Sequence, residues 1–250
     1  MSGGNRSTAW DRMLGPVHRW VWRDPDRRIR KLLLFGEVET DGGRDILRAA
    51  EITPDPLLRR LYLEHAIDEL HHGDLFRERG QALLRARRTA PRTLFNGTPL
   101  PGGHGLDDLH VEDESDPQLL AFLHVAEKAA AGRFEIYRDC VADDPETRAI
   151  FEEILRDEVF HMNYSYAQLN RVSPETSRRR VWAARASRLW KRYLRAMAAL
   201  AGLFGDLMLT GIYFIVLAPF AWAAKRAERR EPAGWQPVSG GRENSPTSLY

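Results

Sequence analysis

The fold is decided by the stretch PLLRRLYLEHAIDELHH at residues 56–72, which residues 145–161, PETRAIFEEILRDEVFH, repeat without a gap. The two stretches match mainly at polar positions, and the longest match is the motif Asp-Glu-x-x-His at residues 68–72 and 157–161. A repeat kept only for packing would preserve its apolar positions first. The shared motif therefore indicates a chemical role in both halves of the chain.

Each repeat begins a long helical pattern. An aspartate followed by proline is a helix-start signal, and it predicts helices over residues 56–85 and 144–171. Helical spacing of apolar residues predicts two more, over residues 26–51 and 116–141. Residues 86–115 are rich in proline and glycine and have no helical period, so we expect a long crossover there. Two hairpins with one long crossover make an all-α four-helix bundle.

One feature weakens the first of these helices. Gly42 and Gly43 should each cost about 1 kcal/mol relative to alanine inside a helix. We expect either close packing at these glycines or a break in the helix.

The repeated motif has the spacing of a metal site. Glu69 and His72, like Glu158 and His161, lie three residues apart and leave the same face of a helix. A single copy of this spacing is common on solvated helix surfaces. Two copies at the same distance from two helix starts favour a shared metal site.

A glutamate on each of the other two helices would complete such a site. Glu37 and Glu127 lie in apolar runs, where an unpaired carboxylate is expensive to bury and metal ligation offsets that expense. Glu39 is the alternative on the first helix. We prefer Glu37, because it has apolar neighbours on both sides, as Glu127 does.

The combined pattern resembles that of the ferritin, bacterioferritin and rubrerythrin superfamily over about residues 26–171. The resemblance implies a ferritin-like bundle with two iron ions, or manganese in place of iron, and reaction with O2 or peroxide. By this resemblance, Glu69 and Glu158 of this chain would bridge the two metals and carry the catalysis. The implied metal ligands are Glu37, Glu69, His72, Glu127, Glu158 and His161. Such a mixed oxygen and nitrogen site suits iron or manganese better than a closed zinc site.

The chain also departs from these relatives. Its single cysteine, Cys140, excludes a rubredoxin-like iron site built from paired CxxC motifs, so electrons must come from an external donor. Ala130 stands where rubrerythrins carry a further glutamate, and Arg44 where bacterioferritins tend to carry a tyrosine. Both differences argue against a standard rubrerythrin peroxidase or a storage ferritin.

Several other polar residues flank the expected ligands. Asp68 and Asp157 would orient ligand histidines on a neighbouring helix, or form salt bridges instead. His65 and His124 are extra ligands or, as we prefer, hydrogen-bonded flanking residues. His71 should point away from the site. The nearby tyrosines are expected to pack rather than act in redox chemistry; they are Tyr137, Tyr164 and Tyr166.

The C-terminal part has the composition of a membrane anchor. Residues 196–224 contain one charged residue, Asp206, and the uncharged stretch 207–224 would span about 27 Å as a helix. Trp190, Tyr193 and Trp222 flank it like interfacial aromatic belts. Asp206 and Pro219 weaken the prediction, so a buried fifth helix or an oligomer contact remains the alternative.

Residues 172–195 read as a basic amphipathic helix suited to anionic lipid. Eight Lys and Arg residues lie in 178–195 and five follow the span, which places the bundle on the cytoplasmic side of a single-pass protein of the cytoplasmic membrane. The formal net charge is only +2 and the basic region has no nucleic-acid recognition motif, so we expect no nucleic-acid partner. Residues 225–250 should be a flexible tail. Residues 1–25 are a lead-in without the apolar core of a secretory signal.

These observations predict a membrane-anchored di-iron oxidoreductase that activates O2 or peroxide. The first alternative is a ferroxidase that handles iron at the membrane, which would need a homo-oligomer or a partner to form a transport path. The second is a non-catalytic helical bundle that is anchored in the membrane.

Overall fold

The structure is a computed structural model that describes residues 13–87 and 111–228. It divides into two compact units, Met1–Arg188 and Leu189–Tyr250, which we describe separately. Within the described ranges the chain is helical and contains no strand. The α-helices are α2 (Gly15–Arg23), α3 (Pro25–Ile52), α4 (Pro56–Arg85), α5 (Asp116–Cys140), α6 (Pro145–Val172), α7 (Ser177–Ile212) and α8 (Ala218–Glu228). A 3-10 turn (Val111–Asp113) precedes α5, and a π-helical turn (Tyr213–Leu217) separates α7 from α8.

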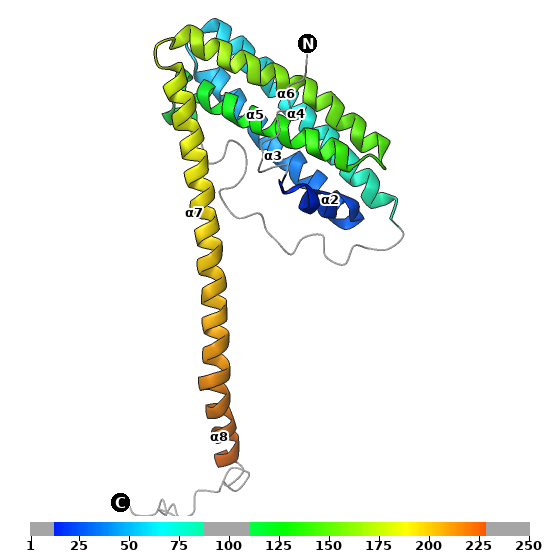
Figure 1. Cartoon of the computed structure of the whole chain (residues 1–250), viewed down its shortest axis with the longest axis vertical. Helices are drawn as coiled ribbons and strands as arrows, with labels where there is room; N and C mark the ends of the chain where they lie inside the picture. Colours follow the sequence, from blue (N-terminus) through cyan, green and yellow to red (C-terminus); the bar gives the residue numbers. More distant parts are fainter. Residues whose placement is uncertain (1–12, 88–110, 229–250) are drawn as a thin grey trace, which may run out of the picture. The chain divides into compact units, whose positions relative to one another are not determined.

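The four predicted helices are confirmed, with ends within two residues of the prediction. They form two hairpins, α3 with α4 and α5 with α6, and α4 also contacts α6 (Figure 1). Asp24, Asp55 and Asp144 each precede a proline and accept hydrogen bonds from backbone N–H groups of the first helical turn. These caps supply the first-turn N–H groups with acceptors, which explains why the helices begin there. Most of the predicted crossover, residues 88–110, and the tail from 229 lie outside the described residues.

Helix α2 was not predicted, because residues 1–25 read only as a polar lead-in. It packs on α3 and α5. The reason is Trp22, which is fully buried and lies 5.2 Å from the Tyr137 ring and 5.3 Å from the Phe151 ring, measured between centroids. A large aromatic side chain of this kind is sufficient to hold a short helix on a bundle.

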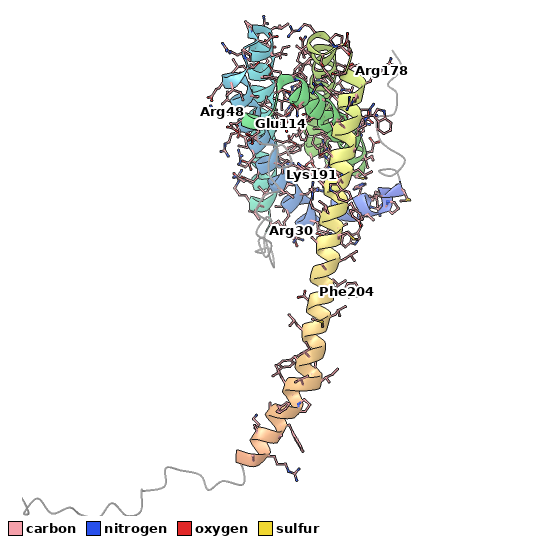
Figure 2. All side chains as sticks on the ribbon, turned by 90° about the vertical axis from the view of Figure 1, so that its left-hand side faces the viewer. Arg30, Arg48, Glu114, Arg178, Lys191 and Phe204 are labelled. Carbon is pink, nitrogen blue, oxygen red and sulfur yellow. The ribbon has the colours of Figure 1, made fainter. Side chains whose placement is uncertain are left out.

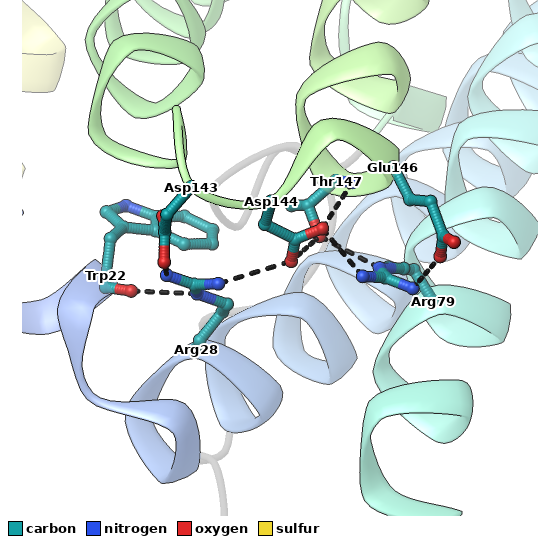
Figure 3. Close-up of polar contacts among 7 residues, drawn as sticks. All are labelled: Trp22, Arg28, Arg79, Asp143, Asp144, Glu146 and Thr147. Carbon is teal, nitrogen blue, oxygen red and sulfur yellow. Dashed lines mark hydrogen bonds and ion pairs between the residues drawn. The ribbon is translucent and has the colours of Figure 1, made fainter. Parts of the chain in front are cut away.

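Buried ion pairs join the two hairpins at one end of the bundle (Figure 3). Asp144, the capping residue of α6, accepts from Arg28 of α3 at 3.2 Å and from Arg79 of α4 at 2.6 Å. Arg79 also donates to Thr147 at 2.9 Å, and Arg28 to the Trp22 carbonyl at 2.8 Å. Because both guanidinium groups are largely buried and share one carboxylate, they fix the start of α6 against α3 and α4.

Glycines set the distance between α3 and α4. Helix α3 continues without a break through Gly42 and Gly43, so the expectation of close packing holds for Gly43. A methyl group on Gly43 would lie 3.0–3.2 Å from atoms of α4, including the Cβ of Glu69. A methyl group on Gly73 would overlap the Thr40 hydroxyl and lie 3.0 Å from the Gly36 carbonyl. The two backbones therefore approach too closely at these positions for any side chain.

The second unit contains most of the apolar C-terminal segment. The helical stretch Ser177–Ala227 is long and apolar enough to cross a membrane, and none of its most apolar window is buried. Phe204, for example, projects from α7 with 70% of its surface exposed (Figure 2). The described part of this segment is thus one long helix with the length and composition of a membrane span.

Two details of this segment differ from the prediction. Helix α7 is continuous from Ser177 to Ile212, so no boundary separates a basic helix ending at 195 from an apolar one. The helix instead widens into the π-helical turn Tyr213–Leu217, just before Pro219. A proline inside a helix lacks an N–H donor and crowds the preceding turn, and a π-turn relieves this crowding.

We expect Gly73→Ala to destabilise the protein and Gly42→Ala to leave it unchanged or more stable. The first methyl group meets Thr40 and Gly36, and overpacking of this kind costs about 1–3 kcal/mol. The second meets no atom within 4 Å and should gain helix propensity of up to about 1 kcal/mol. Denaturant unfolding of the full chain in detergent micelles measures both. Equal unfolding free energies for the two variants would contradict the close approach.

We also expect the full chain to stay in the membrane fraction after alkaline carbonate washing. Leu209→Arg with Ile215→Arg should reduce that fraction strongly, because each arginine costs about 2.5–3.5 kcal/mol near the centre of a span. The matched control places two arginines in the preceding basic region, Leu189→Arg with Leu194→Arg, and should remain bound. Release of the unmodified chain by carbonate would contradict a membrane span.

Candidate metal centre

A polar cluster interrupts the hydrophobic core at the same level on all four helices. One apolar cluster includes Ile46, Tyr62, Leu120 and Leu169, and a second lies further along the bundle around Phe76. On each helix the residues of the polar cluster fall in sequence between these two sets, except His65, which lies between Tyr62 and Ala66 of the first. Its members are Glu39 on α3, His65, Glu69 and His72 on α4, Glu127 on α5, and Glu158 and His161 on α6. A polar group between two apolar layers is excluded from bulk water.

The carboxylates of the cluster lie close together in two pairs, Glu39 with Glu69 and Glu127 with Glu158. Each pair joins the two helices of one hairpin, so the repeat seen in the sequence extends to the side-chain contacts. Burial and a neighbouring carboxylate both favour the protonated form of a carboxyl group.

The pKa shifts follow from this crowding. Burial and the neighbouring Glu69 raise the pKa of Glu39 well above its usual range, and burial and Glu127 raise that of Glu158. Burial disfavours the charged form of Glu69 too, but the nearby His161 and a hydrogen bond with His65 lower its pKa well below the usual value. Burial disfavours the His161 cation, but the hydrogen bond to Asp68 and the nearby Glu69 carboxylate outweigh it and raise the pKa to about 9. A cation bound here would displace these protons.

The two ligand histidines are held by reciprocal contacts between the hairpins. The His72 Nε2 lies 3.1 Å from an Asp157 carboxylate oxygen, and the His161 Nε2 lies 3.0 Å from an Asp68 carboxylate oxygen. Asp68 and Asp157 thus each contact a histidine of the other hairpin, a contact that fits both the orienting role and the salt bridge expected of them. Carboxylates that accept from the outer ring nitrogen fix both the tautomer and the direction of a ligand imidazole.

The inner nitrogens of these histidines face the Glu69 carboxylate without forming a hydrogen bond to it. His72 Nδ1, His161 Nδ1 and Glu158 Oε2 are buried and lack any hydrogen bond. The two nitrogens lie 3.9 and 3.5 Å from Glu69 Oε1. Unpaired buried polar atoms are rare and costly, so atoms that converge on one carboxylate indicate a ligand that the protein does not itself supply.

The potential ligand atoms form two overlapping groups. Those of Glu39, Glu69, His72 and Glu158 lie within 4.8 Å of one another, and so do those of His65, Glu69 and His161. Glu69 belongs to both groups, as a bridging ligand would. Glu127 lies beside the second group, with a carboxylate oxygen 3.7 Å from His65 Nε2. The structure thus brings together five of the six predicted ligands.

The sixth, Glu37, does not join them, and our choice of Glu37 over Glu39 is wrong as to which side chain faces the core. The Glu37 side chain is 63% exposed and lies 3.9 Å from the Arg77 guanidinium. Glu39 lies seven residues from both Leu32 and Ile46, which are buried on the same helix. A spacing of seven residues keeps side chains on one helix face, whereas Glu37 is out of phase with that face. The seven-residue spacing from Leu32 and Ile46 was therefore the sequence signal that distinguished Glu39 from Glu37.

His65 and Tyr164 are the residues that the sequence reasoning undervalued. His65 is fully buried within the cluster, and its Nδ1 lies 2.7 Å from the hydroxyl of the buried Tyr164. By contrast, His124 bonds to the Met162 carbonyl outside the cluster, and His71 is exposed beside Glu153, as expected. The spacing of one helical turn from Glu69 showed only that His65 could line the site. It did not show that the His65 side chain is buried.

Comparisons with models of known protein families, with curated proteins and with solved structures find no match for this chain. Any functional conclusion must therefore come from the geometry of the site.

The pair Glu39 and Glu37 gives a matched test of the site. Glu39→Gln should weaken the binding of Co2+ or Fe2+ by about tenfold or more, because a buried donor is lost, whereas Glu37→Gln should bind as the unmodified chain does. Metal content after loading and desalting, together with a binding titration, measures the difference. Loss of metal in Glu37→Gln with full binding in Glu39→Gln would reverse our assignment.

Proposed function

We propose that this chain is a membrane-anchored di-iron oxidoreductase with a ferritin-like fold, which reduces O2 or peroxide. The observation that supports it most is the set of buried donor atoms without partners, on histidines whose outer nitrogens are anchored by Asp68 and Asp157. Most buried polar atoms in native proteins are hydrogen-bonded, so several unpaired donor atoms that converge on one carboxylate favour a cation site.

The donor set fits two divalent cations. Four carboxylates can balance the four charges of two such ions, and hard oxygen donors with imidazole suit iron or manganese. Glu39 and His72 would hold one ion, and Glu127 and His161 the other. Glu69 and Glu158 would be shared, since both lie at the centre of the cluster and belong to the repeated motif.

A bound ferrous pair would supply two electrons and Lewis acidity for the reduction of O2 or peroxide. The residues of the chain prepare the site for this. Asp68 and Asp157 keep the inner histidine nitrogens directed at the carboxylates. Glu39 and Glu158 release protons on loading, and the apolar layers on either side exclude water.

The rest of the proposal concerns location and electron supply. Cys140 is the only cysteine and lies outside the cluster, so we assign the electrons to an external donor. The apolar segment favours a lipid-soluble substrate or reductant, such as a quinone or an acyl chain. The excess of basic residues before this segment favours a cytoplasmic bundle.

The test uses the full chain, purified in detergent micelles, freed of metal and loaded with Fe2+ without oxygen. We expect about two iron ions per chain and rapid O2 consumption on mixing, in line with the donor set of two-metal sites of this class. Glu158→Gln should lose both, whereas Glu153→Gln, an exposed position on the same helix, should keep both.

Two outcomes would contradict the proposal. Substoichiometric iron that is unchanged by Glu158→Gln would leave a non-catalytic anchored bundle. Uptake of many more than two ions per chain with each O2 pulse would instead favour an iron-handling ferroxidase.

A further inference from the structure

We infer that His65 is a seventh metal ligand, which belongs to one metal position only and makes the two positions unequal. This inference rests on the proposed function, because it concerns the same pair of ions. It goes further by assigning a residue that the Glu-x-x-His repeat does not contain.

The repeat itself identifies His65 as the exception. Residues of the first hairpin correspond to those of the second at an offset of 89, which relates Glu69 to Glu158 and His72 to His161. At the same offset His65 corresponds to Ile154, which is fully buried. Tyr164, the partner of His65, corresponds to Leu75. The contact between His65 and Tyr164 therefore has no counterpart in the other half.

The geometry of His65 matches that of the two ligand histidines. Each has one ring nitrogen held by a group at the edge of the cluster and the other directed at the carboxylates. For His65 the held atom is Nδ1, at 2.7 Å from the Tyr164 hydroxyl. The inward atom is Nε2, which lies 3.2 Å from Glu69 and 3.7 Å from Glu127. If an ion took the place of the proton between Nε2 and Glu69, and Nδ1 kept its proton toward Tyr164, the Nε2 lone pair would face that ion.

The position of His65 assigns it to one side. Its ring stacks on that of His161, with centroids 3.7 Å apart, and both share Glu69 as a neighbour. His65 is absent from the group formed by Glu39, Glu69, His72 and Glu158. The ion held by Glu127 and His161 would thus gain a second imidazole. The ion held by Glu39 and His72 would have fewer protein ligands, so an oxidant would bind there.

A histidine that only positions Glu69 would behave differently. Glu69 is shared between the two ions, so a residue that acts through Glu69 alone affects both ions equally. A residue that binds one ion affects that ion alone. The two roles are therefore separable by measuring the two binding steps individually.

The experiment titrates the metal-free full chain with Co2+ and records calorimetric heat and visible absorption. We expect two unequal classes of site in the unmodified chain. His65→Ile introduces the residue present in the other half, and should weaken the tighter class by at least about tenfold while the second class changes by less than about twofold. The two classes of site should then have more similar affinities for Co2+. The absorption of the affected class should change, because its coordination changes.

Two further variants guard against misfolding of His65→Ile. Tyr164→Phe keeps the imidazole but removes its anchor, and should weaken the same class by about tenfold. Tyr166→Phe is the matched control, since Tyr166 packs beside His124 outside the cluster, and should bind as the unmodified chain. Thermal unfolding of each metal-free variant checks that the bundle is intact.

Equal weakening of both classes in His65→Ile, or two unchanged classes in both His65→Ile and Tyr164→Phe, would overturn the inference and leave the proposed function standing. Failure of the unmodified chain to bind two ions would overturn the proposed function and this inference with it.

Discussion

The structure depends on one electrostatic constraint, the burial of four glutamates at one level of a helical bundle. Carboxylates cannot lie together in an apolar interior as anions without a compensating charge. In this chain burial and the neighbouring carboxylates, Glu69 beside Glu39 and Glu127 beside Glu158, raise the pKa of Glu39 and of Glu158 and so favour their protonated forms. The cluster is thus arranged to exchange protons for a stronger cation, and the surrounding helices are arranged to keep the carboxylates in place.

Two kinds of contact keep them there. The glycines of α3 and α4 bring one pair of backbones so close that a methyl group on Gly43 would lie 3.2 Å from the Cβ of Glu69. The shared carboxylate of Asp144 fixes the start of α6 against Arg28 and Arg79, and so fixes the phase of the helix that carries Glu158. Both contacts position helices that carry the predicted ligands.

Most of the bundle was predictable because its signals are local. Aspartate and proline at helix starts, and apolar periodicity between them, gave α3 to α6 within two residues. The errors arose where the answer depended on the phase of a helix or on distant contacts. Glu37 has apolar sequence neighbours, but Leu34 among them is itself exposed, so local hydrophobicity did not report the buried face. Helix α2 is held by Trp22 against residues far along the chain. The role of His65 depends on its contact with Tyr164, which is 99 residues away in the sequence.

The reciprocal contacts between the hairpins have an evolutionary consequence. His72 with Asp157 and His161 with Asp68 are the same contact made twice, as in an interface between identical subunits. A symmetric dimer of one ancestral hairpin would already present three donors from each copy. Such a dimer must carry the same residue at both related positions. Joining the copies in one polypeptide removes that requirement. The corresponding positions 65 and 154 can then carry different residues, His65 and Ile154.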